Sequence, residues 1–249
     1  DVTAPQIMGV FPAVARQVLR GDIKEASVSA ERFVHVPSLQ SGRIGFEDKV
    51  SQKHDVKTFT CEEVPAETLA VARCTVVFSD REKATPVFPL KRYYKNGLYH
   101  SSTGELAWKP GENSCYGWFT INTPATKAVV GFAENTTHTL GPVTIKMQSR
   151  FAALYITARE KESDLSSSRN LLVVAVARAR NSGMKVFNDA RILERGGAPV
   201  VMEPVKAEIT INKPGDPVVH VVDHAGCRTG RSLPVKGTTF TIDGVRDKT

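Results

Sequence analysis

Long hydrophobic runs and cysteines are scarce in this chain of 249 residues. No apolar run approaches the roughly 18 residues that a membrane-spanning helix needs, and the longest, Leu171 to Ala177, has the length of a strand. Four cysteines are too few for a disulfide framework at this length. A hydrophobic share of 41% and a charged share of 24% exclude a disordered, coiled-coil or collagen-like chain. We therefore expect a folded protein without a membrane partner.

The signatures of several common catalytic classes are also missing. The sequence contains no Gly-x-Ser-x-Gly nucleophile elbow, no His-Glu-x-x-His zinc helix and no Gly-x-x-x-x-Gly-Lys phosphate loop. A dinucleotide-binding fold needs a Gly-rich turn between a strand and a helix, and that helix is missing. On these grounds we expect no cofactor.

Acidic residues accompany the basic ones along the chain, although 33 Lys and Arg against 26 Asp and Glu give a net charge of +7. Mixed runs such as Asp80-Arg81-Glu82-Lys83 are typical of a solvated surface. A face that binds nucleic acid more often has a basic stripe with few acids. We therefore expect no nucleic-acid partner.

Apolar and polar residues alternate in several short segments, a pattern typical of strands with one buried face. The segments are Val143–Met147, Leu154–Ala158, Ala207–Ile211 and Phe240–Ile242. Turn signals such as Asn96-Gly97 and Asp243-Gly244 separate strand-like segments. The sequence predicts an all-β fold built on an antiparallel β-sandwich, and it leaves open a smaller second β sub-domain.

Composition divides the chain into three segments. We assign residues 1–78 to an N-terminal linking layer, 79–205 to the main sandwich and 206–249 to a C-terminal β sub-domain that can be continuous with the sandwich. The sequence begins without Met or a leader-like segment and stops after a strand-like one, so we expect an excised fragment or a mature product.

Helical spacing is confined to one short segment near the start of the chain. It comprises Phe11, Val14, Val18 and Leu19, and Gly21 ends it. Arg20-Gly21-Asp22 spells an adhesion tripeptide, but such short matches are common by chance. We interpret it as a turn.

Two groups of residues could hold a metal ion or form a disulfide. The most metal-like cluster is His220, His224 and Cys227, but the two histidines would lie about 13 Å apart on one strand. The segment between them favours a turn, so we interpret the histidines as turn residues and Cys227 as a core thiol. Cys61 and Cys74 could bridge neighbouring strands, with buried free thiols as the default. We expect no metal.

Six carboxylates are candidates for glycoside cleavage, which needs two such groups across a cleft. They are Glu105, Glu112, Glu134, Glu160, Glu162 and Asp164. No segment pattern places two of them together, so we assign no catalytic residue. If hydrolysis occurs, the first candidates are Glu105, Glu112 and Glu134, because they surround an aromatic cluster in the sequence.

Aromatic residues make up only 7% of the chain, but six of them fall within positions 93–118. Alternation places Trp118 on the polar face of its strand with Thr120 and Asn122. A large apolar side chain on a polar face indicates a binding or packing role. Exposed rings are suitable platforms for the flat C–H faces of sugars. We therefore predict a carbohydrate-binding site, with packing under a loop or against a second sheet as the alternative. Its candidate residues are Trp118, Tyr94, Tyr99, Trp108 and Tyr116.

An ordered set of segments resembles a known family. The segments are Leu19-Arg-Gly-Asp-Ile23, Thr103-Gly-Glu-Leu-Ala-Trp108, Phe119-Thr-Ile-Asn-Thr-Pro124, Ala128-Val-Val-Gly-Phe132, Ser168-Arg-Asn-Leu-Leu172, Ala177-Arg-Ala-Arg-Asn-Ser-Gly-Met184 and Ala198-Pro-Val-Val-Met-Glu-Pro-Val205. In this order they resemble the β-rich region that follows the catalytic TIM barrel in some bacterial glycoside hydrolases of the cellulase-like and agarase-like kind. The resemblance covers most of residues 16–245.

The resemblance implies an accessory region rather than a catalytic one. The catalytic carboxylates of those enzymes lie on barrel strands upstream of this region, so none carries over. The implied function is a non-catalytic carbohydrate-binding or accessory β-sandwich module of a secreted polysaccharide-degrading enzyme, in an extracellular or periplasmic setting. Its implied partners are a polysaccharide or oligosaccharide and the catalytic TIM-barrel domain of the parent enzyme.

Two alternatives stay open. One is a catalytically active β-sandwich glycosidase or lyase, whose mark would be two opposed carboxylates in a cleft or a carboxylate near a Lys and a Tyr. The other is a purely structural domain that braces the barrel, whose mark would be an apolar docking patch.

Overall fold

Strands dominate the protein, with 44% of residues in strands and 13% in helices. The computed structural model describes residues 4–43, 50–51, 56–57, 62–111, 116–187 and 191–247. The expected all-β class with antiparallel sheets is confirmed. The chain forms two compact units: a discontinuous unit of residues 1–22 and 120–249, and an inserted unit of residues 23–119. The three-segment division inferred from composition stays a prediction.

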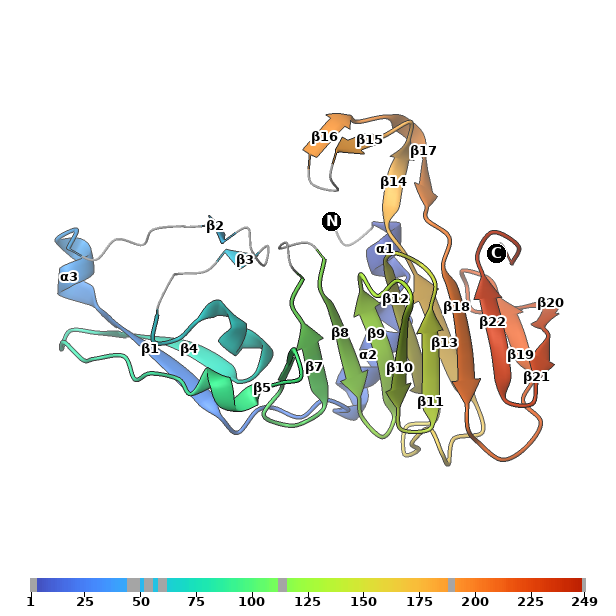
Figure 1. Ribbon diagram of the computed structural model, residues 1–249, viewed down its shortest axis with the longest axis horizontal. Helices are drawn as coiled ribbons and strands as arrows, with labels where there is room; N and C mark the ends of the chain where they lie inside the picture. The colour runs from blue at the N-terminus through green and yellow to red at the C-terminus, as the bar shows by residue number, and fades with distance from the viewer. Residues whose placement is uncertain are drawn as a thin grey trace. The chain divides into compact units, whose positions relative to one another are not determined.

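Two antiparallel sheets build the discontinuous unit as a β-sandwich (Figure 1). The first sheet contains, in spatial order, β10 (Thr136–Leu140), β11 (Val143–Met147), β18 (Lys206–Ile211), β22 (Thr239–Asp243) and β21 (Val235–Lys236). The second contains β13 (Leu171–Val176), β12 (Ala152–Ala158), β9 (Thr126–Gly131) and β8 (Trp118–Asn122), whose first two residues belong to the inserted unit. Val143, Ile145 and Met147 are buried and the residues between them are not, as the alternation predicts.

Two strands of the second sheet differ from the prediction in their burial. All seven residues of β12 are buried, although the alternation in Leu154–Ala158 predicts one face in water. Helix α2 (Phe11–Arg20) contacts β12 and β13 and so shields part of the second sheet. The apolar run of β13 predicts a strand covered on both faces, yet residues 171–175 are only half-buried. The reason is that β13 pairs with β12 alone and forms the edge of the sheet.

The segment with helical spacing is a helix, and the turn expected at Gly21 ends it. A short helix α1 (Pro5–Met8) precedes α2, which ends at Gly21 in the left-handed conformation with φ of 64°. Glycine adopts this conformation without the strain that a side chain would add. Ala13 and Gln17 are the buried residues of α2, whereas Val18 and Leu19 are 75% and 79% exposed.

Two hairpins extend the discontinuous unit. The hairpin arm consists of β14 (Ala179–Ser182), β15 (Lys185–Phe187), β16 (Arg191–Glu194) and β17 (Gly197–Met202), with β14 paired to β17 and β15 to β16 (Figure 1). Residues 191–202 of the arm are all exposed. The second hairpin pairs β19 (Val219–Val222) with β20 (Arg228–Leu233).

The inserted unit contains the one parallel strand pair among the described residues. Strand β1 (Ser29–His35) pairs in parallel with β4 (Arg73–Ser79), which departs from a purely antiparallel fold. Strands β5 (Tyr94–Lys95), β6 (Leu98–His100) and β7 (Leu106–Lys109) pair antiparallel in that order. The shorter elements are α3 (Val36–Gln40), β2 (Val50–Ser51), β3 (Val56–Lys57), η1 (Ala66–Ala70) and η2 (Leu90–Tyr93). A small core is formed by Ala30, Val71, Ala72 and Phe88.

Candidate functional site

Three of the five predicted site residues lie side by side on neighbouring strands of the inserted unit. Tyr94 on β5 is paired with Tyr99 on β6, and Tyr99 is paired with Trp108 on β7. Directly paired residues of an antiparallel sheet share a face. The ring centroids of Tyr94 and Tyr99 are 4.8 Å apart, and those of Tyr99 and Trp108 are 5.7 Å apart. We call these three residues the aromatic row.

The local sequence explains how the row forms. Asn96 and Gly97 both have positive φ, 53° and 79°, which is the geometry of a two-residue hairpin turn and joins β5 to β6 in this register. Tyr93, the residue before Tyr94, stacks on Phe88 of the small core, with the ring centroids 5.8 Å apart. Consecutive tyrosines therefore have different roles, one in the core and one in the row.

Exposure falls along the row. Tyr94 is 48% exposed, whereas Tyr99 and Trp108 are half-buried and Tyr99 packs against the core of the inserted unit. Tyr99 lies between the other two residues in the strand order, and its ring contacts both of theirs. Tyr94 therefore offers the most accessible ring for a ligand.

Trp118 is the first residue of β8, and Tyr116 lies two residues before it. Both are half-buried. A Cβ atom on Gly117 would lie 2.8 Å from the Lys109 carbonyl oxygen and 3.2 Å from Trp108 Nε1. Only glycine allows this close approach, so the segment runs directly beside the end of β7 and the Trp108 indole. Trp118 and Trp108 are both half-buried.

The electrostatics of the row do not favour base catalysis by tyrosine. Burial raises the pKa of Tyr99, and the negative charge of Glu67 and the neighbouring Tyr94 raise it further. A tyrosine that removes a proton at neutral pH needs a lowered pKa. The carboxylate of Glu67 thus raises the pKa of Tyr99, whereas a lyase would need that pKa to be lowered.

Two of the candidate carboxylates, Glu160 and Asp164, have pKa values shifted in the direction opposite to that of a general acid. Hydrogen bonds from Ser168 and Asn170 lower the pKa of Glu160 to about 2. Ser166 and Ser167 likewise hold the pKa of Asp164 well below its usual value. A proton donor in glycoside cleavage needs a raised pKa instead.

The other candidate carboxylates are placed as follows. Glu105 Oε2 accepts a hydrogen bond from the backbone N–H of Lys24 at 2.8 Å. Glu134 and Glu162 are exposed, and Glu112 lies outside the described residues.

The histidine–cysteine segment forms a hairpin turn. The Asp223 carboxylate accepts hydrogen bonds from the backbone N–H groups of Ala225 and Cys227 between β19 and β20, which confirms the expected turn. Cys227 is exposed, so its interpretation as a core thiol is wrong: a short hairpin turn has no core to cover it. Across the described parts of the chain, no three His, Cys, Asp or Glu side chains are grouped to hold a metal ion. Cys74 is a half-buried free thiol, and Cys61 falls outside the described residues.

The two charged side chains of the Arg-Gly-Asp segment are buried and paired with each other, so they are not displayed for an adhesion partner. The side chains of Arg20 and Asp22 are only 6% and 3% exposed, and they pair at 2.8 Å. Thr126 Oγ1 donates to the Asp22 carboxylate at 2.7 Å and accepts from Arg20 at 3.2 Å. The two charged side chains therefore fasten the end of α2 to the second sheet.

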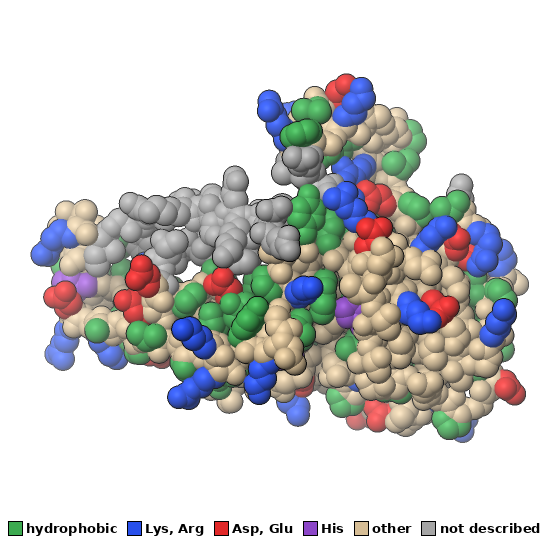
Figure 2. Space-filling view, viewed as in Figure 1, with side chains coloured by type: hydrophobic (Ala, Val, Ile, Leu, Met, Phe, Trp, Pro, Cys, Tyr) green, Lys and Arg blue, Asp and Glu red, His purple; other side chains and the backbone are tan. Residues whose placement is uncertain are grey.

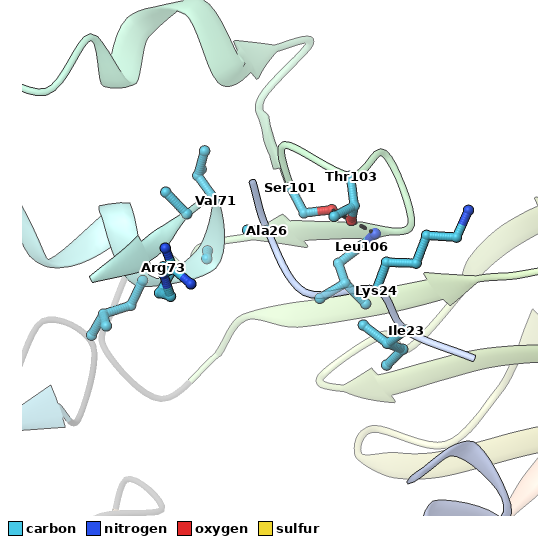
Figure 3. A pocket seen from close by; sticks show the side chains of 11 residues that line it. Ile23, Lys24, Ala26, Val71, Arg73, Ser101, Thr103 and Leu106 are labelled. Carbon is cyan, nitrogen blue, oxygen red and sulfur yellow. Dashed lines mark hydrogen bonds between the residues drawn. The ribbon is translucent and has the colours of Figure 1, made fainter. Parts of the chain in front are cut away.

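A shallow pocket in the inserted unit lies between η1, the start of β4 and the segment between β6 and β7 (Figure 3). Its volume is about 170 Å³. Ser101 Oγ is bonded to Thr103 Oγ1 at 3.0 Å and accepts the Leu106 N–H at 3.0 Å. Arg73 is paired with Glu25 at 2.5 Å, so this cation is already partly neutralised. The described residues that line the pocket include no Asp or Glu, and no sequence signal marks it because three separate segments form it.

No protein-family model, no curated protein and no solved structure matches the chain. Within the described residues, no helix is long and apolar enough to cross a membrane.

Proposed function

We propose that the chain is a non-catalytic carbohydrate-binding accessory module, and that the aromatic row is its ligand-binding surface. The observation that carries the proposal is the placement of Tyr94, Tyr99 and Trp108 on three adjacent strands, with Tyr94 48% exposed. A partly exposed ring that packs against Tyr99, which in turn packs against Trp108, is a rigid apolar platform for a sugar ring. Tyr116 and Trp118 extend the candidate surface. Because polymeric glycans do not enter cells, the proposal includes an extracellular or periplasmic setting.

A binding experiment with matched variants tests this proposal. The full chain is mixed with insoluble cellulose, xylan, mannan and agar, and the bound fraction is measured for the native chain, Tyr94→Ala, Trp118→Ala and Phe187→Ala. Phe187 is the control, because it is a 57% exposed aromatic residue of the hairpin arm, outside the inserted unit. We expect glycan affinity to fall about tenfold in Tyr94→Ala and in Trp118→Ala, because each loses a stacking contact, and to stay unchanged in Phe187→Ala. Failure to bind any glycan, neutral or acidic, or equal losses at Phe187, would refute the proposal.

The catalytic alternative is tested separately by release of reducing ends. We expect no hydrolysis of cellulose, β-glucan, xylan, mannan or agar after long incubation at high protein concentration, because the carboxylates with shifted pKa values are held ionised. Release that disappears when one carboxylate is mutated, with the fold intact, would replace the binding proposal by an enzymatic one.

A second candidate function is bracing of a neighbouring catalytic domain. The hairpin arm favours it, because Phe187, Ile192 and Leu193 are 57%, 55% and 57% exposed. Large exposed apolar side chains that lie together indicate a docking surface. Bracing would be supported if the native chain binds the catalytic barrel of the parent enzyme and Leu193→Asp does not. Glycan binding should be unchanged in this variant.

A further inference from the structure

The cations around the aromatic row suggest which glycans it binds. We propose that its ligand is an acidic polysaccharide, with carboxylate or sulfate groups along the chain, and this inference rests on the proposed carbohydrate-binding function. The contacts are assigned to a basic-aromatic turn, defined as Lys91, Arg92, Tyr94 and Lys95.

The basic residues of this segment lack acidic neighbours in the sequence. Between Glu82 and Glu105 the sequence contains no Asp or Glu, but it contains Lys83, Lys91, Arg92 and Lys95. Residues 165–188 form another acid-free stretch with four basic residues, but there Arg178 and Arg180 pair with Glu203, and Lys185 pairs with Glu194. The segment that forms η2 and β5 is thus a local concentration of positive charge.

The backbone places these cations beside the exposed ring. Lys91 and Arg92 lie in the last turn of η2, and Tyr94 follows this helix directly as its extended C-cap residue. Lys91, Arg92, Tyr94 and Lys95 are all exposed. Lys95 is paired with Leu98 on the other face of the sheet, so it contributes to the field more than to direct contact. Figure 2 shows Lys and Arg side chains gathered around β5.

These cations are not neutralised by neighbours. Lys91, Arg92 and Lys95 have no ion pair with any described acidic residue, whereas Lys146 pairs with Glu208 at 2.6 Å. Lys83 is different, because its ammonium lies over the Phe33 ring at 3.8 Å, and we exclude it from the site.

One acidic side chain limits the site. Glu67 acts on Tyr99, whose pKa its charge helps to raise, and it would repel an anionic ligand there. The ligand is therefore confined to the Tyr94 end of the row. There the guanidinium of Arg92 can form two parallel hydrogen bonds with a carboxylate or a sulfate, and Tyr94 can stack on the adjoining sugar ring. A neutral glycan would leave the cations without a function.

Single-stranded nucleic acid is the main competing ligand, since it also combines stacking with positive charge. It needs several free aromatic faces for successive bases. The row offers mainly the ring of Tyr94, because Tyr99 is half-buried and its ring contacts both neighbouring rings. The geometry therefore favours a sugar chain with one stacked residue.

The test compares four ligands on the full chain: polygalacturonate, a sulfated galactan, neutral agarose and poly(dT). We expect both acidic glycans, or the one whose anionic group fits, to bind at least about tenfold more tightly than agarose, with affinity falling as salt rises from about 50 to 500 mM. The double variant Lys91→Gln/Arg92→Gln should lower acidic-glycan affinity about tenfold and leave agarose binding unchanged. Tyr94→Ala should weaken both.

A matched control separates local charge from net charge. Arg191→Gln/Arg195→Gln removes the same two charges from the exposed hairpin arm and should leave binding unchanged. Equal losses in the two double variants would overturn the inference. Agarose binding with no preference for acidic glycans would overturn it and leave the proposed function standing, whereas retention on no glycan would refute both. Tighter binding of poly(dT), lost in the Lys91 and Arg92 variant, would assign the site to nucleic acid.

Discussion

Removal of the Arg20 side chain tests how the discontinuous unit is held together. Arg20 Nε and Nη2 donate to the two Asp22 carboxylate oxygens at 2.9 and 2.8 Å. Its guanidinium also donates to Thr157 Oγ1 and to the Ala158 carbonyl oxygen at the end of β12. The fully bonded pair is nearly inaccessible to water, so the Asp22 carboxylate depends on Arg20 for its charge compensation. Arg20→Met keeps much of the side-chain volume and removes this compensation.

The magnitude follows from burial. Removal of one partner of a buried ion pair leaves an uncompensated charge and typically costs about 3–5 kcal/mol. Since domains are stable by about 5–15 kcal/mol, this is a large fraction of the free energy of unfolding. Lys146→Met is the matched control, because the Lys146–Glu208 pair is 56% and 33% exposed and should contribute at most about 1 kcal/mol.

Urea denaturation with two optical signals gives the measurement. Circular dichroism follows the whole chain, whereas both tryptophans, Trp108 and Trp118, lie in the inserted unit. We expect Arg20→Met to shift the unfolding of the discontinuous unit and to change the tryptophan signal less. Adding Asp22→Leu to Arg20→Met should restore part of the stability, because no buried charge is then left alone. A loss below about 1 kcal/mol, or additive losses in the double variant, would refute the reasoning.

Three further predictions concern single positions. Leu154→Ala, at a fully buried site, should lower the free energy of unfolding by about 2–5 kcal/mol, and Leu172→Ala, on the half-buried edge strand, by clearly less; equal losses in urea denaturation would contradict the burial pattern. Burial lowers the pKa of His138, so the unfolded chain binds a proton more readily than the folded one. The free energy of unfolding should therefore fall as the pH drops below about 6.5, and this pH dependence should be smaller in His138→Gln. The Glu160 carboxyl should titrate near pH 2 when followed by NMR, and a midpoint near 4.5 would contradict this. The stability that its hydrogen bonds add should be fully present above the ordinary pKa of a glutamate and should be lost as the pH falls through about 2.

The sheets were predictable because period-two alternation encodes burial locally. Val143–Met147 follows the pattern residue by residue. The burial of β12 was not predictable, because its second face is covered by a helix that is distant in sequence. The parallel pairing of β1 with β4 was equally hidden, since no local pattern specifies which distant strand becomes a neighbour.

The candidate site was predictable in part. Clustering of aromatic residues in the sequence pointed to Tyr94, Tyr99 and Trp108, and strand pairing brings these three together. Which of two consecutive tyrosines faces water depends on the short helix before β5, which has no clear sequence signature. Lys91 and Arg92 were missed because charge was assessed over the whole chain, although the absence of acids between residues 82 and 105 is visible in the sequence.

The discontinuous arrangement of the sandwich has a consequence for the order in which the chain can fold during synthesis. Arg20 and Thr157 are 137 positions apart, and the whole inserted unit lies between them. A ribosome needs on the order of ten seconds for such a stretch. A ten-residue helix is not stable in water by itself, so α2 gains its support only when β12 emerges. The inserted unit can fold in the meantime, because its strand pairs β1–β4 and β5–β7 lie within its own residues. Helix α2 is therefore translated well before the strand that stabilises it.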